Sequence, residues 1–141
     1  MAALAQRSMA KNLVRWRPYQ LNPDIPVTGI DRNEYLLRKF GNAERIREVL
    51  HAIENAMRTD GIHVNLHRIR TTSNTYLGHR LMMLAQSQGR TNELLNEFFI
   101  AYFVQGRDIG DPQVLQELGH LASLPAADVT TELHKHEPHP E

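Results

Sequence analysis

Apolar residues recur at three- and four-residue intervals along most of this chain, which is the spacing of amphipathic α-helices. The sharpest stripe consists of Ile46, Val49, Leu50, Ile53 and Met57. A wider apolar face consists of Leu94, Leu95, Phe98, Phe99, Tyr102 and Phe103, and it predicts the central helix of the core. Helices are predicted over seven ranges, which are residues 2–11, 31–40, 42–60, 74–88, 91–105, 112–123 and 126–135.

Residues that favour helix ends support this division. Short polar side chains that can accept a hydrogen bond from a first-turn N–H group precede the apolar stripes, and glycines follow several of them. Caps are predicted at Asp31, Asn42, Asn74 or Ser73, Thr91 and Asp111. The short connections between these amphipathic helices predict a compact antiparallel cluster of helices.

Two short segments alternate with a period of two residues, which is typical of strands. In the first, near residues 13–20, Val14 and Trp16 point to one side and their neighbours to the other, until Pro18 ends the pattern. The second covers residues 62–69 and alternates Ile62, Val64 and Leu66 with polar residues.

Composition excludes several classes of function. The chain has 16 Lys and Arg residues and 16 Asp and Glu residues, so no net charge attracts nucleic acid or anionic lipid. The longest fully apolar run, Phe98–Val104, is too short to cross a bilayer as a helix. The chain contains no cysteine, which excludes disulfides, thiolate nucleophiles and cysteine-bound metals.

The beginning of the chain allows two interpretations. No acidic residue precedes Asp24, whereas Arg7, Lys11, Arg15 and Arg17 do. An acid-free start of this kind is found in mitochondrial presequences, but it also fits an amphipathic helix followed by a strand. We therefore expect a cytoplasmic protein, or a mitochondrial one if this start is a targeting signal.

Four blocks of the sequence resemble the FrnE-like branch of the DsbA family, to which the 2-hydroxychromene-2-carboxylate isomerases are related. They are VRWRPYQLNPDIP, DRNEYLLRKFG, SNTYLGHRLMMLAQSQGR and FFIAYFVQGRDIGDPQVL, and they occur in the order and with the spacing of that family. The resemblance extends from about residue 1 to about residue 133.

The resemblance implies a mostly α fold, namely the helical insertion domain of a DsbA-like thioredoxin fold with a remnant strand near residues 13–20. Residues 1–29 would be a remnant thioredoxin helix, strand and loop, residues 30–135 the insertion, and residues 136–141 a polar tail. The family's Cys-x-x-Cys motif would lie before Met1, and its cis-proline loop and last strands after Glu141.

Three functional hypotheses follow. The first is a non-catalytic subunit that associates with itself or within a larger assembly, because disulfide exchange requires a thiolate and this chain has none. The second is one part of a DsbA-like disulfide oxidoreductase that is completed by further sequence or by another chain. The third is a cysteine-independent isomerase-like protein that binds glutathione or another small molecule.

The helix expected to start near residue 74 carries the candidate ligand-binding residues, which are Asn74, Thr75, His79 and Arg80. Asn74 is equally explained as a helix cap, His79 as a core residue and Arg80 as a surface residue. Val14, Trp16 and Tyr19 are the candidate interface, because a lone strand leaves its backbone groups unpaired.

No cofactor and no metal site are predicted. His63 and His67 lack a third ligand, and His134, His136 and His139 lie in a proline-containing tail. Arg107, Asp108 and Asp111 could suggest acid–base chemistry, but capping by Asp111 explains that turn equally well.

Overall fold

The computed structural model describes residues 14–135, and this part of the chain is mostly helical, as predicted. The predicted helix at residues 2–11 and the tail at 136–141 lie outside the described residues. The α-helices are α2 (Arg32–Phe40), α3 (Ala43–Thr59), α4 (Tyr76–Ser87), α5 (Thr91–Phe99), α6 (Pro112–Leu121) and α7 (Ala126–His134). None of the helices within residues 14–135 has the length and apolar character needed to span a bilayer.

Local chemistry explains where the helices begin. Asp31 Oδ1 accepts a hydrogen bond from the N–H of Glu34 at 3.0 Å, and Asn42 Oδ1 accepts one from the N–H of Arg45 at 2.8 Å. Asp111 caps α6 in the same way through the N–H of Gln113. These three caps are confirmed. Thr91 is not a cap, because α5 already includes it and no side chain caps that helix.

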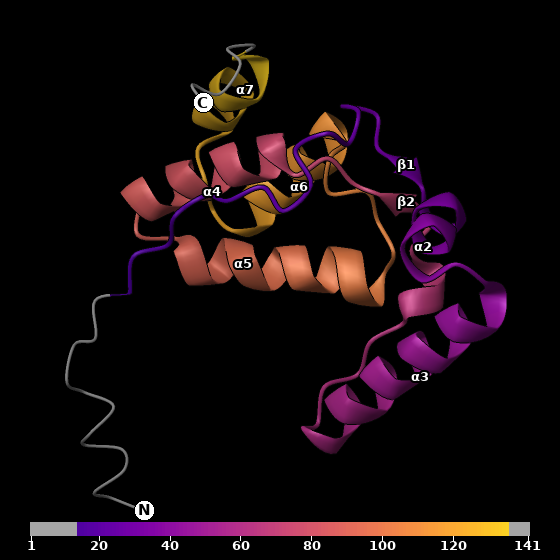
Figure 1. Ribbon diagram of the computed structural model, residues 1–141. Coiled ribbons are helices and arrows are strands. Elements are labelled where there is room, and N and C mark those ends of the chain that lie inside the picture. The colour runs from indigo at the N-terminus through magenta and orange to yellow at the C-terminus, as the bar shows by residue number, and fades with distance from the viewer. Residues whose placement is uncertain (1–13, 136–141) are drawn as a thin grey trace, which may run out of the picture.

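The core lies among α4, α5, α6 and α7, which lie together apart from α3 in Figure 1. Its largest fully buried side chains are Leu81, Leu94, Leu115 and Leu118. The last helix adds Val129 and Leu133, which are 2% and 5% exposed. Burial of these apolar side chains is the main source of stability in a protein without disulfides.

The region formed by α2 and α3 is packed much less. Helix α2 contributes one buried side chain, Leu36, and α3 contributes none. Figure 1 shows α3 extending away from the other helices. The stripe predicted on α3 is half-buried at Ile46 and exposed at Ile53, so the helix is present but only partly covered.

Two short strands join these regions. Strand β1 (Ile30–Asp31) pairs antiparallel with β2 (Thr71–Thr72), with Ile30 opposite Thr72. Both predicted strand positions are therefore wrong within the described residues. Residues 14–20 form no strand because no other segment described here pairs with them.

The second predicted strand, residues 62–69, instead contains a turn of 3-10 helix, η1 (Leu66–Arg68). One of its backbone bonds goes to the end of the central helix and the others are local, so the described residues show no strand pairing here. The N–H of Asn65 donates to the carbonyl of Phe103 at 2.7 Å, and its side chain donates to the carbonyl of Val104 at 3.1 Å. Leu66 is thereby buried in the alternating segment.

The central helix changes its pitch before it ends. After α5, the π-helical segment η2 (Ile100–Val104) continues the same rod, and the N–H of Gln105 donates to the carbonyl of Ile100. Gly106 then ends it with a φ of 68°. A side chain on Gly106 would collide with the carbonyl of Arg68, so only glycine fits this junction.

Candidate functional site

Asn74 has a structural position at the beginning of α4. Its Nδ2 donates to the carbonyl of Ile25 at 2.6 Å, and its Oδ1 accepts from the N–H of Tyr76 at 2.9 Å. The side chain therefore fixes the preceding loop to the first turn of α4. The N-cap of α4 is Thr75, without a side-chain cap bond, so the cap predicted at Asn74 or Ser73 is wrong by one residue or more, although Asn74 still binds the first N–H of the helix.

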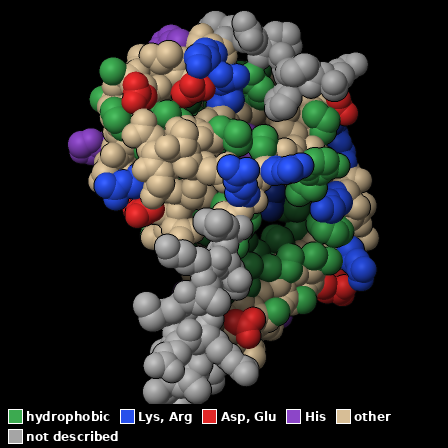
Figure 2. All heavy atoms as spheres, turned by 90° about the vertical axis from the view of Figure 1, so that its left-hand side faces the viewer, with side chains coloured by type: hydrophobic (Ala, Val, Ile, Leu, Met, Phe, Trp, Pro, Cys, Tyr) green, Lys and Arg blue, Asp and Glu red, His purple; other side chains and the backbone are tan. Residues whose placement is uncertain are grey.

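Thr75 and His79 lie on the wall between two grooves, and both residues line each groove. The first, which we name the apolar groove, has a volume of about 260 Å³. Its hydrophobic lining includes Trp16, Met82, Met83, Leu95, Phe98 and Ile109. Figure 2 shows hydrophobic side chains gathered in a hollow on one face of the molecule, with basic side chains along its rim.

The second groove, which we name the polar pocket, has a volume of about 320 Å³. Arg32, Tyr35, Thr72 and Tyr102 line it together with His79. Sequence reasoning did not identify this site, because its residues come from four separate segments. The pairing of β1 with β2 brings Arg32 to Thr72 across some forty residues of chain, and η2 adds Tyr102.

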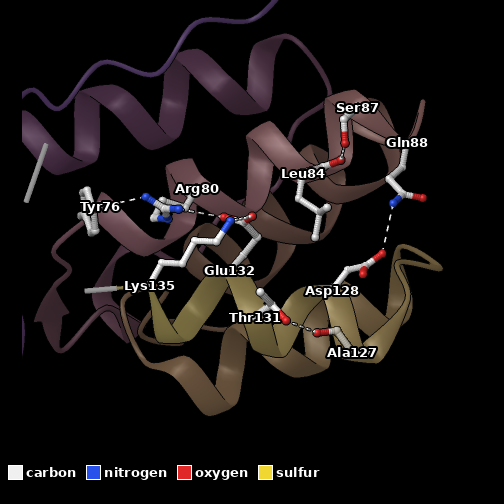
Figure 3. Close-up of polar contacts among 10 residues, drawn as sticks. All are labelled: Tyr76, Arg80, Leu84, Ser87, Gln88, Ala127, Asp128, Thr131, Glu132 and Lys135. Atoms are coloured by element: carbon white, nitrogen blue, oxygen red, sulfur yellow. Dashed lines mark hydrogen bonds and ion pairs between the residues drawn. The ribbon is translucent and has the colours of Figure 1, made fainter. Parts of the chain in front are cut away.

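Arg80 points away from both grooves, toward α7. Its Nη2 lies 3.0 Å from Glu132 Oε2, and its Nη1 donates to the hydroxyl of Tyr76 at 3.2 Å (Figure 3). The hydrogen bond with Tyr76 is the main cause that raises the pKa of Arg80, with Glu132 adding to it. Arg80 therefore ties α4 to α7, and a ligand beside His79 would not meet it.

Glu132 receives a second cation. Lys135 Nζ donates to Glu132 Oε1 at 2.7 Å, and this bond is the main cause that lowers the pKa of Glu132, followed by the bond from Arg80. Further along the same two helices, Gln88 donates to Asp128 (Figure 3). The polar side chains between α4 and α7 thus serve to hold the two helices together.

The candidate interface residues are on the surface. Val14 is 67% exposed, Trp16 48% and Tyr19 75%, and Leu21 beside them is 82% exposed. Within the described residues, the main chain of 14–20 makes one hydrogen bond, from the N–H of Trp16 to Gln86 Oε1 at 2.8 Å. This segment therefore lies along α4 without the bonding of a strand.

The remaining candidates are accounted for by structural contacts. Asp111 caps α6, Arg107 forms an ion pair with Glu117, and Asp108 Oδ1 accepts from the hydroxyl of Ser73 at 2.6 Å. Of the predicted aromatic face, Phe98 is buried but Phe99 is 53% exposed.

The histidines show no sign of metal binding in the part of the chain that is described. His63 and His67 are exposed, and residues 14–135 contain no group of three or more potential ligands. The ring of His134 contacts the carbonyl of Thr130 at 2.7 Å. His136 and His139 lie outside the described residues.

Within the polar pocket, the charge of Arg32 acts on Tyr102. Burial is the main cause that raises the pKa of Tyr102, while the positive charge of Arg32 acts in the opposite direction. The Arg32 guanidinium also lies 5.7 Å from the centre of the Tyr35 ring, and its Nη1 donates to Thr72 Oγ1 at 3.2 Å. The pocket therefore combines the guanidinium of Arg32 with the phenols of three tyrosines and the hydroxyl groups of Thr72 and its neighbours.

The chain is similar to known proteins in both sequence and structure. The model of the DSBA-like thioredoxin domain matches residues 1–137. The chain is also similar to the crystal structure of a probable DsbA oxidoreductase from Streptomyces coelicolor, with a TM-score of 0.75 and 27% sequence identity. The similarity covers 83% of this chain and 51% of that one, so this chain spans about half the length of the solved relative. No curated protein matches it.

Proposed function

Because the chain belongs to the DSBA-like thioredoxin domain family, we propose that it acts as a non-catalytic, associating member of that family. On this proposal, residues 30–135 form the helical domain, and residues 1–29 join it to a partner that carries the cysteines. The solved relative, a probable DsbA oxidoreductase, is about twice as long as the region that this chain matches. The partner proposed here is a thioredoxin-type sheet.

One observation carries the proposal: the 141 residues contain no cysteine. Thiol–disulfide exchange proceeds by attack of a thiolate on a disulfide sulfur, so it needs at least one sulfur nucleophile. The chain can therefore contribute to such chemistry by binding, positioning or covering a partner. It cannot supply the reacting atom.

The surface for this association is the Trp16 surface, which we define by Val14, Trp16, Tyr19 and Leu21. All four side chains are exposed although they are apolar or aromatic. The backbone of residues 14–20 has no regular secondary structure and makes one hydrogen bond within the described residues, so most of its N–H and C=O groups are open to pairing. Addition of a strand satisfies such groups and covers the side chains at the same time.

The charges of this segment favour binding to a different polypeptide over pairing with a second copy of the chain. Residues 14–21 include Arg15 and Arg17 and no acidic residue. Antiparallel pairing of two copies about Trp16 would set Arg15 of each copy opposite Arg17 of the other, and like charges directly opposite destabilise a strand pair. An edge strand with acidic side chains would instead be attracted to this surface.

The first test is a disulfide-exchange assay on the purified chain. We expect no turnover above the uncatalysed rate, with or without glutathione. Turnover by the chain alone would contradict the proposal, since no residue could carry it.

The second test uses Trp16, the single tryptophan of the chain, as a reporter. We expect a short strand-forming peptide that alternates valine with glutamate to shift the Trp16 emission to the blue and to saturate. The matched peptide with lysine in place of glutamate should bind more weakly. Equal response to both peptides, or no response to either, would contradict the assignment.

Two variants and a dilution series complete this design. The double substitution R15E and R17E should reverse the preference from the acidic to the basic peptide, whereas R47E on the exposed face of α3 should leave it unchanged. A blue shift that appears with rising protein concentration and no peptide would assign the surface to a second copy, and would overturn the choice of partner.

A further inference from the structure

Arg32 differs from the other half-buried arginines of the described chain. Three arginines in this region are neither exposed nor fully buried, namely Arg32, Arg80 and Arg107. Arg80 is paired with Glu132 and Arg107 with Glu117, but Arg32 has no carboxylate partner within residues 14–135. A guanidinium cannot lose its charge at physiological pH, so its partly buried charge lacks compensation.

The fold holds Arg32 firmly in the lining of the polar pocket. Its N–H donates to the carbonyl of Arg70 at 2.9 Å, directly after the β1–β2 pair, which lies beside the start of α2 in Figure 1. Its Nη1 is aligned by Thr72 Oγ1, and its plane is near the Tyr35 ring. One donor is thus used internally, and the other guanidinium N–H groups remain for a ligand.

Tyr102, which also lines the pocket, supplies a second donor. It lies in the π-helical segment η2, and π-helical turns are uncommon and are frequently found at functional sites. Its pKa is raised, mainly by burial, so the phenol keeps its proton at neutral pH and can donate a hydrogen bond. A group that accepts from both Arg32 and Tyr102 would be a small anion.

The charges around the pocket limit the anion to one negative charge. Arg32 is the only lysine or arginine among the described residues that line it. Asp108 is close enough to raise the pKa of Tyr102, and its Oδ1 already accepts from Ser73 and from the N–H of Gly110. A phosphate dianion would face this carboxylate with too little positive charge to offset it, whereas a carboxylate needs one guanidinium.

We propose that the polar pocket binds a small monocarboxylate, which accepts hydrogen bonds from the Arg32 guanidinium and the Tyr102 hydroxyl while the Tyr35 ring contacts its hydrocarbon part. A volume of about 320 Å³ is suited to a ligand of this size. This assignment does not depend on association through the Trp16 surface, because it concerns the chain alone. The two proposals can therefore fail separately.

The test compares 4-phenylbutyrate with its uncharged counterpart 4-phenylbutanamide, by calorimetry and by NMR chemical-shift mapping of the isolated chain. We expect saturable binding of the carboxylate, with shifts centred on Arg32, Thr72 and Tyr102, and at least about tenfold weaker binding of the amide. Equal affinity for the two compounds, or shifts elsewhere, would overturn the proposal.

Variants separate a specific site from general charge attraction. R32Q should weaken binding of the carboxylate at least about tenfold, because it removes a charge-assisted hydrogen bond. R38Q removes an exposed arginine of the same helix and should leave binding unchanged. Equal losses in R32Q and R38Q would show nonspecific attraction and contradict the site.

Two further measurements keep the test informative if R32Q is unstable. Y102F removes one hydroxyl without changing charge, and it should weaken binding about threefold to tenfold. Inorganic phosphate should compete poorly with 4-phenylbutyrate. If phosphate competes more strongly than the carboxylate binds, the monocarboxylate assignment is wrong.

Discussion

The helices α4 to α7 and the pair α2 and α3 were equally clear as sequence patterns, yet they are packed very differently. The first group contains every large side chain that is fully buried, including Leu81 and Leu118. Helix α3 has a regular apolar stripe but no buried residue. An amphipathic pattern therefore shows that a helix forms and which face is apolar, but not whether that face finds a partner.

This contrast implies unequal stability within one chain. Regions with few buried apolar contacts open more readily than a well-packed core, and they exchange amide hydrogens faster. We expect α3 to be the less protected region. The same substitution should accordingly have a different cost in each region.

The largest effect is expected for L118A in α6. Leu118 is 1% exposed, so removal of its side chain leaves a cavity and should lower the free energy of unfolding by about 3 kcal/mol. The matched control is L37A in α2, where the side chain is 47% exposed and the loss should be below about 1 kcal/mol. Urea denaturation measures both. Equal losses of unfolding free energy in L118A and L37A would contradict the difference in packing between the two regions.

The second-largest loss of stability is expected at the junction between the two regions. G106A places a methyl group against the carbonyl of Arg68 at a φ of 68°, and should cost about 2 kcal/mol. G89A has a similar φ of 69° but open space around it, and should cost about 1 kcal/mol. Comparing the melting temperatures of the two variants separates the effect of the collision from the effect of the backbone strain. A larger loss in G89A would contradict the close approach.

A smaller effect is expected where polar contacts tie α4 to α7. The pKa of Glu132 is lowered from its ordinary value of 4.5, mainly by Lys135 and then by Arg80. Its contribution, about 1 kcal/mol or less for such a partly exposed network, is complete above pH 4.5 and is lost as the pH falls through the lowered pKa of the folded state.

E132Q tests this contribution. The variant should lose that stability at neutral pH and should show a weaker decline of stability with acidification than the unchanged chain. D128N serves as the control, because it alters the neighbouring contact with Gln88 and leaves Glu132 in place. An identical acid dependence of E132Q and the unchanged chain would show that other carboxylates cause the decline.

The smallest effect should come from the stripe on α3. Ile53 is 39% exposed, so I53A should change the free energy of unfolding by about 0.5 kcal/mol. Hydrogen exchange followed by NMR should show the change confined to α3. A loss as large as that of L118A would mean that a partner in solution covers this stripe.

Much of the fold followed from local chemistry. The family resemblance is confirmed, and so are the mostly helical fold and the caps at Asp31, Asn42 and Asp111. Such caps are readable from sequence because the side chain and the N–H group that it binds lie two or three residues apart. Interactions of that range depend little on the rest of the chain.

The errors lie where a partner is distant. The alternation around Trp16 was interpreted as a strand, but a strand needs a neighbour, and none pairs with it in residues 14–135. Arg80 shares α4 with His79, as the sequence predicts, but its ion pair with Glu132 of the distant helix α7 has no local sequence signal. Arg32 carried no signal, because the pocket around it is assembled by the contact between β1 and β2.

The π-helical segment at residues 100–104 has one more consequence, which concerns chain length. A π turn spans one residue more than an α turn, so loss of a single residue there can be absorbed by a change from i+5 to i+4 bonding. The rod would remain continuous from α5, and the chain beyond the segment, including the junction at Gly106, would keep its direction. Only the side chains within the segment would turn, so we expect a deletion next to Tyr102 to spare the scaffold while moving this phenol out of the polar pocket.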